Sequence, residues 1–155
     1  MRTETNNITV EKAAISKIDQ IDFDNLAFGS VFTDHMLVCD YKNGVWENPK
    51  IIPYQPVTLD PSSKIFHYGQ SIFEGMKAYK DKHGDIFLFR PIDNHKRLNI
   101  SAKRMAIPEL PENHFMEGLT TLLNLDEAFI PTKEGSSLYI RPFIFASGKG
   151  FHASP

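Results

Sequence analysis

The chain has 155 residues, 41% of them hydrophobic and 23% charged, so it is long enough to bury a core and has an ordinary globular composition. Its formal net charge of -2 gives no electrostatic reason to expect nucleic acid or an anionic membrane as a partner. Cys39 is the only cysteine, which excludes an internal disulfide and a cysteine-rich metal site and fits a reducing, cytoplasmic compartment. No stretch approaches the roughly 20 apolar residues of a membrane span, and residues 1–20 contain no apolar signal segment.

The N-terminal third is predicted to contain a polar arm followed by strands. Residues 1–24 are polar and poorly periodic, so we expect a flexible arm there and a single small domain over 25–155. Residues 28–41 are rich in β-forming residues, and Asn43-Gly44 follows them as a turn signal. A strand pair joined at that turn is therefore predicted, with the second strand extending to residue 52.

The remaining elements alternate between strands and helices. A hairpin is predicted with its turn at residues 81–85, because apolar segments flank a His-Gly pair. Amphipathic helices are predicted from Pro91 to before Pro108 and from Pro111 to before Pro131. The segment SLYIRPFIFA then predicts one strong strand. Together these elements predict an α+β fold, an antiparallel sheet with packed helices. The chain ends without a terminal helix, which suggests an interrupted protein.

Common catalytic and metal-binding motifs are missing. The histidines show no paired spacing typical of a metal site, and the sequence contains no nucleophile elbow, Walker loop or dinucleotide fingerprint. Two arginines remain as candidates. Tyr139 and Arg141 lie two apart in a predicted strand, so both side chains should leave the same face and could receive a carboxylate. Arg97 lies in a predicted helix. From the residues alone, the pattern favours a solvated surface cation over a ligand-binding residue for each arginine.

Four segments, taken together, resemble the branched-chain amino acid aminotransferases, which are fold-type IV pyridoxal-phosphate enzymes. They occur in the family's order and at about its spacing: FGSVFTDHMLVCDY, PYQPVTLDPSSKIFHYGQSIFEGMKAYK, LFRPIDNHKRLNISAKRM and SLYIRPFIFA. The similarity covers roughly residues 28–146. The elements FTDHM, HYG…FEG…KAY and YIRP favour this family over the related D-amino acid aminotransferases and aminodeoxychorismate lyases.

The resemblance implies a role for six residues. Arg97 matches the arginine that grips the phosphate of pyridoxal 5'-phosphate, and Arg141 matches the arginine associated with the distal carboxylate of glutamate. The other four would bind substrate. Phe28, Phe73 and Tyr139 match aromatic walls of the pocket for the branched side chain, and Tyr68 matches a tyrosine that reaches into the neighbouring subunit's active site.

The resemblance also implies what this chain does not supply. In the family, the lysine that carries the cofactor belongs to a second, larger domain, which would follow Pro155. None of the lysines here occupies its motif, so the chain alone is expected to have no catalytic residue and no activity. The complete enzyme would be a homodimer that exchanges amino groups between leucine, isoleucine or valine and 2-oxoglutarate. Two alternatives stay open: another fold-type IV transaminase or lyase, and a non-catalytic assembly or ligand-binding module.

Overall fold

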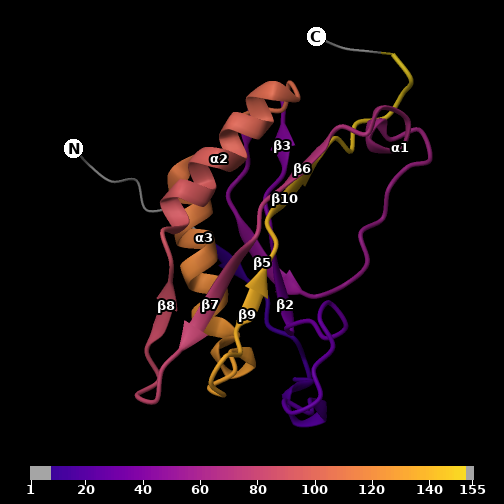
Figure 1. Cartoon of the computed structure of the whole chain (residues 1–155). Coiled ribbons are helices and arrows are strands. Elements are labelled where there is room, and N and C mark those ends of the chain that lie inside the picture. The colour runs from indigo at the N-terminus through magenta and orange to yellow at the C-terminus, as the bar shows by residue number, and fades with distance from the viewer. Residues whose placement is uncertain (1–7, 153–155) are drawn as a thin grey trace.

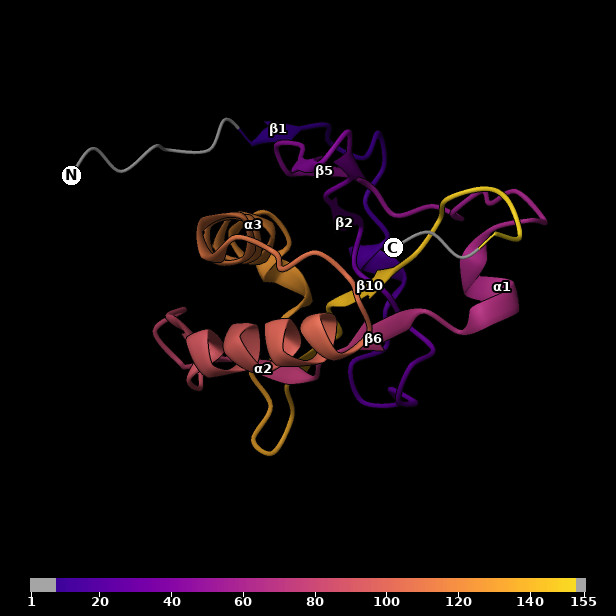
Figure 2. The same ribbon diagram turned by 90° about the horizontal axis from the view of Figure 1, so that it is seen from above.

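The computed structural model describes residues 8–152, which form helices packed against short strands (Figures 1 and 2). The strands are β1 Thr9–Val10, β2 His35–Val38, β3 Tyr41–Lys42, β4 Val45–Trp46, β5 Lys50–Pro53, β6 Ser71–Phe73, β7 Met76–Lys80, β8 Ile86–Leu88, β9 Leu138–Ile140 and β10 Phe143–Phe145. The α-helices are α1 Lys64–Tyr68, α2 Pro91–Arg104 and α3 Glu112–Leu125, and 3-10 turns cover Ile18–Gln20 and Glu127–Phe129. The predicted α+β class is confirmed.

The strands form several small sheets, and nearly all of their pairings are antiparallel. One sheet has the order β8-β7-β9, and β10 pairs with β6 beside it. In a separate sheet β2 pairs with β5, and β1 runs parallel to β5. The hairpin β3–β4 turns at Asn43 and Gly44, whose φ angles of 52° and 83° suit the predicted tight turn.

The segment SLYIRPFIFA is not one strand as predicted. It divides at Arg141-Pro142 into β9 and β10, because a proline has no N–H with which to continue the ladder. The partner segment divides at Glu74-Gly75, between β6 and β7. The two breaks face one another, since the Glu74 N–H donates to the Pro142 carbonyl at 2.8 Å. We call the place where the two breaks meet the crossing point, and most residues of the candidate site lie at or next to it.

The strand predicted over residues 28–41 is also shorter than expected. Within that range the paired strand residues are His35–Val38 and Tyr41, which begins β3, and residues 28–30 form a turn. Both the backbone N–H and the hydroxyl of Ser30 donate to the Ala27 carbonyl, at 3.2 and 2.7 Å. A serine side chain that bonds locally in this way competes with sheet formation. As a result, Phe28 lies in a loop rather than in a strand.

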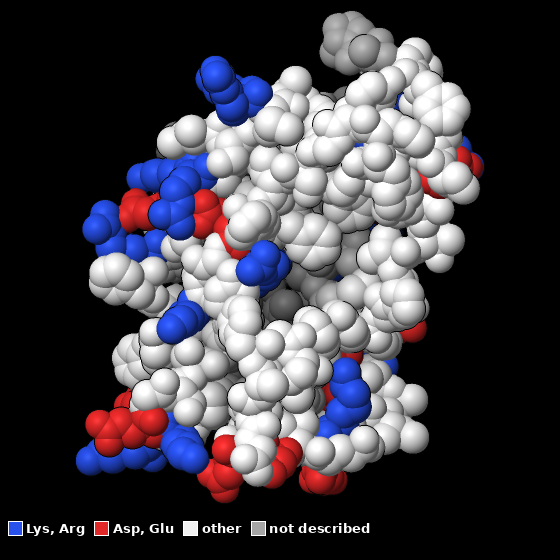
Figure 3. All heavy atoms as spheres, turned by 45° about the vertical axis from the view of Figure 1, so that its right-hand side comes forward, with Lys and Arg blue, Asp and Glu red and all other residues white. Residues whose placement is uncertain are grey.

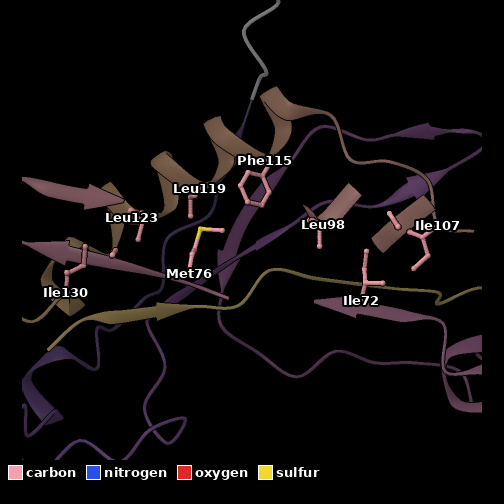
Figure 4. Packing of buried hydrophobic residues seen from close by; sticks show 10 residues of the cluster. Ile72, Met76, Leu98, Ile107, Phe115, Leu119, Leu123 and Ile130 are labelled. Carbon is pink, nitrogen blue, oxygen red and sulfur yellow. The ribbon is translucent and has the colours of Figure 1, made fainter. Parts of the chain in front are cut away.

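Helices α2 and α3 follow the predicted periodicity and cover the sheet β8-β7-β9. Leu98 and Ala102 of α2, and Phe115, Leu119 and Leu123 of α3, are buried. They meet Ile72 and Met76 from the strands in the core shown in Figure 4. In Figure 2 these two helices lie together, and α1 lies apart from them. None of the described helices is long and apolar enough to cross a membrane.

Residues 1–7 of the predicted arm lie outside the described residues, whereas several residues between Thr9 and Lys17 contact the sheet or the loop before it. The backbone of Thr9–Val10 pairs with β5, and the Lys17 N–H donates to the Asp34 carboxylate at 3.0 Å. The Ala13 N–H donates to His35 Nε2 at 2.8 Å. Since Nε2 therefore accepts, His35 Nδ1 carries the proton and donates to Asp126 at 2.6 Å. Whether the arm is mobile, and where the domain begins, stay predictions.

Candidate functional site

Four residues predicted for substrate binding come together at the crossing point of the strands. A terminal nitrogen of Arg141 donates to the Tyr139 hydroxyl at 3.1 Å. The Arg141 guanidinium carbon lies 4.6 Å from the Phe73 ring centroid and 5.3 Å from the Tyr139 ring centroid. Phe28 meets Tyr139 edge to face, with centroids 5.1 Å apart. We call Phe28, Phe73, Tyr139 and Arg141 the aromatic wall.

The aromatic wall is open and carries an uncompensated positive charge. Phe28 is 80% exposed and Phe73 is 60% exposed. Within residues 8–152, no carboxylate lies within ion-pair distance of Arg141. Ring faces can bury an apolar ligand group, and a free guanidinium can bind a carboxylate through two parallel hydrogen bonds. The wall can therefore receive both kinds of group at one place.

Gly75 makes room for this arrangement. A Cβ atom built on Gly75 would lie 2.5 Å from the Tyr139 hydroxyl oxygen and 3.2 Å from the adjoining ring carbon. Both separations are below ordinary van der Waals contact. A glycine at this position allows the Tyr139 ring to lie against the backbone where it meets Arg141.

Arg97 lies on α2 and binds a buried carboxylate. Its Nε and one terminal nitrogen each donate to Glu74 at 2.6 Å, a bidentate pair. Glu74 is 5% exposed, and the Asn94 amide also donates to it at 3.1 Å. Hydrogen bonding to Arg97 holds the pKa of Glu74 below its usual range, and the same pair raises the pKa of Arg97. The two groups are therefore ionised together.

The exposed edge of Arg97 leaves one hydrogen-bond donor available to an anion such as a phosphate. The arginine side chain is 65% exposed, and among the described residues nothing accepts a hydrogen bond from its other terminal nitrogen, Nη1. That nitrogen can donate to an anion while Glu74 holds the opposite edge. Because Glu74 offsets the charge of Arg97, the pair by itself attracts a dianion weakly.

Tyr68 is not brought to the aromatic wall within this chain. It lies at the end of α1, is 52% exposed, and its hydroxyl donates to the Phe151 carbonyl. Figures 1 and 2 show α1 projecting away from the sheets that carry the aromatic wall. Elsewhere, a cavity of about 640 Å³ lies beside the β3–β4 hairpin and includes none of the six predicted residues. In the described part of the chain, no group of three or more His, Cys, Asp or Glu could hold a metal ion.

Solved structures similar to this chain define its fold class. It matches the branched-chain amino acid aminotransferase from Escherichia coli with a TM-score of 0.54 and 28% identity, over 68% of this chain and 33% of that one. A second branched-chain amino acid aminotransferase, the T.th. enzyme complexed with N-(5'-phosphopyridoxyl)-L-glutamate, matches with a TM-score of 0.50 and 27% identity, over 74% of this chain and 34% of that one. The fold is that of part of a fold-type IV aminotransferase.

Curated relatives define the family more closely, although no protein-family model matches the chain. Branched-chain-amino-acid transaminase 1 of Bacillus subtilis is 47% identical over 143 residues, which are 92% of this chain and 40% of that protein. Branched-chain-amino-acid aminotransferase 2 of the same organism is 50% identical over 127 residues, covering 81% of this chain and 35% of the relative. The chain is thus a homologue of the N-terminal part of branched-chain amino acid aminotransferases and spans about 35 to 40% of their length.

Proposed function

We propose that the complete protein transfers amino groups between leucine, isoleucine or valine and 2-oxoglutarate, and that this chain supplies one wall of its active site. The observation that carries the proposal is the aromatic wall, where exposed rings surround an arginine that has no acidic partner in the described residues. Apolar rings favour a branched side chain, and the arginine favours a carboxylate. The names of the curated relatives support the same substrates over those of a fold-type IV lyase.

The aromatic wall would serve both substrates without a large rearrangement. A branched side chain loses contact with water as it packs against Phe28, Phe73 and Tyr139, which contributes roughly 25 cal/mol for each Å² of apolar surface buried. Glutamate instead places its distal carboxylate against Arg141, whose orientation the Tyr139 hydroxyl maintains. Because Arg141 is exposed, its charge need not be desolvated when the branched substrate binds.

Pyridoxal 5'-phosphate is the cofactor that we propose for the complete enzyme. When bound, it supplies the electron sink through which an amino group is exchanged. The role of this chain would be to hold its phosphate through Arg97, which is charged at all physiological pH values and presents an unoccupied donor edge.

The isolated chain is proposed to be inactive, because the lysine that carries the cofactor would lie in the larger domain. A test compares the 155-residue chain with the complete protein, using leucine, isoleucine, valine, alanine and aspartate as donors to 2-oxoglutarate. The complete protein should prefer the three branched substrates, and the isolated chain should give no turnover. Preference for alanine or aspartate would reject the proposed substrates, and turnover by the isolated chain would reject its role as one part of an enzyme.

We further propose a cytoplasmic homodimer in which Tyr68 completes the partner's site. The exposed position of Tyr68, apart from the aromatic wall of its own chain, supports this arrangement. Mixing the complete Tyr68→Ala protein with the complete Arg97→Ala protein tests it, because a mixed dimer would contain one site with both native residues. Recovery of activity on mixing is expected. If Tyr68 serves its own subunit instead, no mixed dimer contains an intact site and mixing restores nothing.

Large exposed apolar residues are numerous in this chain, as expected if the rest of the protein covers them. They include Phe66, Phe89 and Phe143, which are 61%, 78% and 56% exposed. On the face shown in Figure 3, most of the surface is uncharged, and charged side chains lie mainly toward the left and lower margins. Such surfaces usually mark contacts with other protein segments, which supports the proposal that further domains or a partner subunit pack here.

A further inference from the structure

Glu74 is a buried carboxylate that the aromatic wall does not use. It lies between Phe73 of β6 and Gly75, at the break between strands, and only 5% of its side chain is exposed. Burying an ionised carboxylate is costly unless hydrogen bonds and an opposite charge compensate it. Here Arg97 donates to both carboxylate oxygens, and the Asn94 amide donates to one of them. The pairing of Arg97 with both oxygens favours the ionised form of Glu74.

The backbone at Glu74 is fixed as firmly as its side chain. Its N–H donates to the Pro142 carbonyl at 2.8 Å, and the Asn94 amide donates to the carbonyl of the following residue, Gly75, at 3.2 Å. The carboxylate is therefore held by the strand crossing and by α2 at once. A bidentate pair also sets the plane of the guanidinium, because both nitrogens on one edge must face the carboxylate. The free Nη1 of Arg97 then has one preferred direction.

The residues on either side of Glu74 belong to the aromatic wall or make room for it. Phe73 lies under the Arg141 guanidinium, and Gly75 leaves the space that the Tyr139 hydroxyl occupies. Since successive side chains along an extended segment point to opposite faces, Glu74 reaches toward α2 while Phe73 reaches toward the wall. Three consecutive residues thus connect the arginine proposed for the cofactor with the arginine proposed for the substrate.

We propose that Glu74 is a positioning residue that presents Arg97 to the phosphate of the cofactor. This inference rests on the proposed function, in which Arg97 binds that phosphate. Simple charge reasoning predicts the opposite effect, because a carboxylate near a phosphate dianion repels it. The two views therefore differ in sign: loss of the Glu74 charge weakens phosphate binding if Glu74 positions Arg97, and strengthens binding if it acts only as a neighbouring negative charge.

The test measures how well the complete apoprotein distinguishes pyridoxal 5'-phosphate from pyridoxal, which has no phosphate. We define the ratio as the dissociation constant of pyridoxal divided by that of pyridoxal 5'-phosphate. This ratio reports the phosphate contact alone, and its measurement requires no amino acid substrate. Glu74→Gln keeps the size of the side chain but presents an amide that cannot accept every donor now bound. It should lower the ratio about tenfold, as expected when one charge-assisted contact is lost, through weaker binding of pyridoxal 5'-phosphate while pyridoxal binding stays unchanged.

Two further variants separate positioning from charge and from folding. Glu74→Asp keeps the charge but is one methylene shorter, so it should also lower the ratio, by a smaller factor. In the Arg97→Ala background, Glu74→Gln should cause no further loss, because the residue being positioned is gone. Asp93→Asn, which removes the exposed pair between Asp93 and Arg90 on the same helix, is the matched control and should keep the wild-type ratio.

Several results would overturn the inference. A ratio that rises in Glu74→Gln would assign Glu74 a repulsive role only. Equal losses for pyridoxal and pyridoxal 5'-phosphate would assign it a merely structural role, as would an unchanged ratio in both Glu74 variants. A wild-type protein that does not prefer the phosphorylated compound would refute the cofactor assignment, and this inference with it. Failure to use branched-chain amino acids would refute the proposed substrates and leave the measured ratio standing.

Discussion

Replacing Gly75 with alanine should displace Tyr139 and disable the aromatic wall. The added Cβ would lie 2.5 Å from the Tyr139 hydroxyl oxygen, so that oxygen must move by about 1 Å to reach ordinary contact. Tyr139 is half-buried, so its ring can turn outward, which would break its hydrogen bond to Arg141 and its edge contact with Phe28. Overpacking of this kind costs about 1–3 kcal/mol.

Because the Tyr139 ring must return to its present position when substrate binds, this cost should appear in catalysis by the complete enzyme. At about 1.4 kcal/mol for each factor of ten, kcat/KM for leucine should fall roughly fivefold to a hundredfold in Gly75→Ala. Gly148→Ala is the matched control, since a Cβ there would meet no atom within 4 Å. Removing the hydroxyl with Tyr139→Phe should relieve the closest clash, so the two changes should cost less together than the sum of their separate effects. Wild-type kinetics in Gly75→Ala, or strictly additive losses in the double variant, would refute the reasoning.

Three further predictions concern charged and titrating groups. In the complete protein, Arg97→Ala should weaken pyridoxal 5'-phosphate binding about tenfold to a hundredfold, as measured by titrating the apoenzyme, and an unchanged affinity would make Arg97 a surface cation. Because the pKa of Glu74 is lowered from 4.5 on folding, its pairing with Arg97 should stabilise the protein above about pH 4.5 and lose this effect as the pH falls further. The difference in thermal midpoint between wild type and Glu74→Gln should therefore shrink on acidification, and a constant difference would contradict the pairing. Burial, with Asp40 and Glu47 nearby, raises the pKa of Cys39 to about 11, so iodoacetamide at about pH 8 should label it far more slowly in the native than in the unfolded protein, and equal rates would contradict its burial.

The sequence predicts the helices well because their stability depends on a local pattern. Apolar residues at helical spacing in α2 and α3 become the buried faces, and prolines mark where both helices begin. The strands are less predictable, because pairing depends on distant partners. The break at Arg141-Pro142 could have been anticipated from the proline, but the turn at residues 28–30 depends on a local serine hydrogen bond that hydrophobic pattern does not reveal.

The residues of the candidate site were also predictable from the sequence only in part. The motifs YIRP and FEG, through their similarity to the family, predicted Tyr139, Arg141 and Phe73 as substrate-binding residues. The structure brings these three residues together with Phe28. It did not name Glu74, although an acidic residue within the apolar run SIFEGM is a usable signal, since a buried acid needs a partner. Its partner Arg97 lies 23 residues away, on a different element, and only the packing of α2 on β6 makes the pair.

The central claim, that one wall serves both kinds of substrate, depends most directly on Arg141. Single-turnover rates of the complete enzyme, measured separately with leucine and with glutamate, isolate the two half-reactions. Leucine has no second carboxylate, whereas glutamate would place one against an apolar group in Arg141→Leu, which is unfavourable. We expect the glutamate rate to fall at least about tenfold more than the leucine rate, for loss of a charged hydrogen bond of about 1.5–3 kcal/mol. Equal losses for the two amino acids, or no loss for either, would contradict the account.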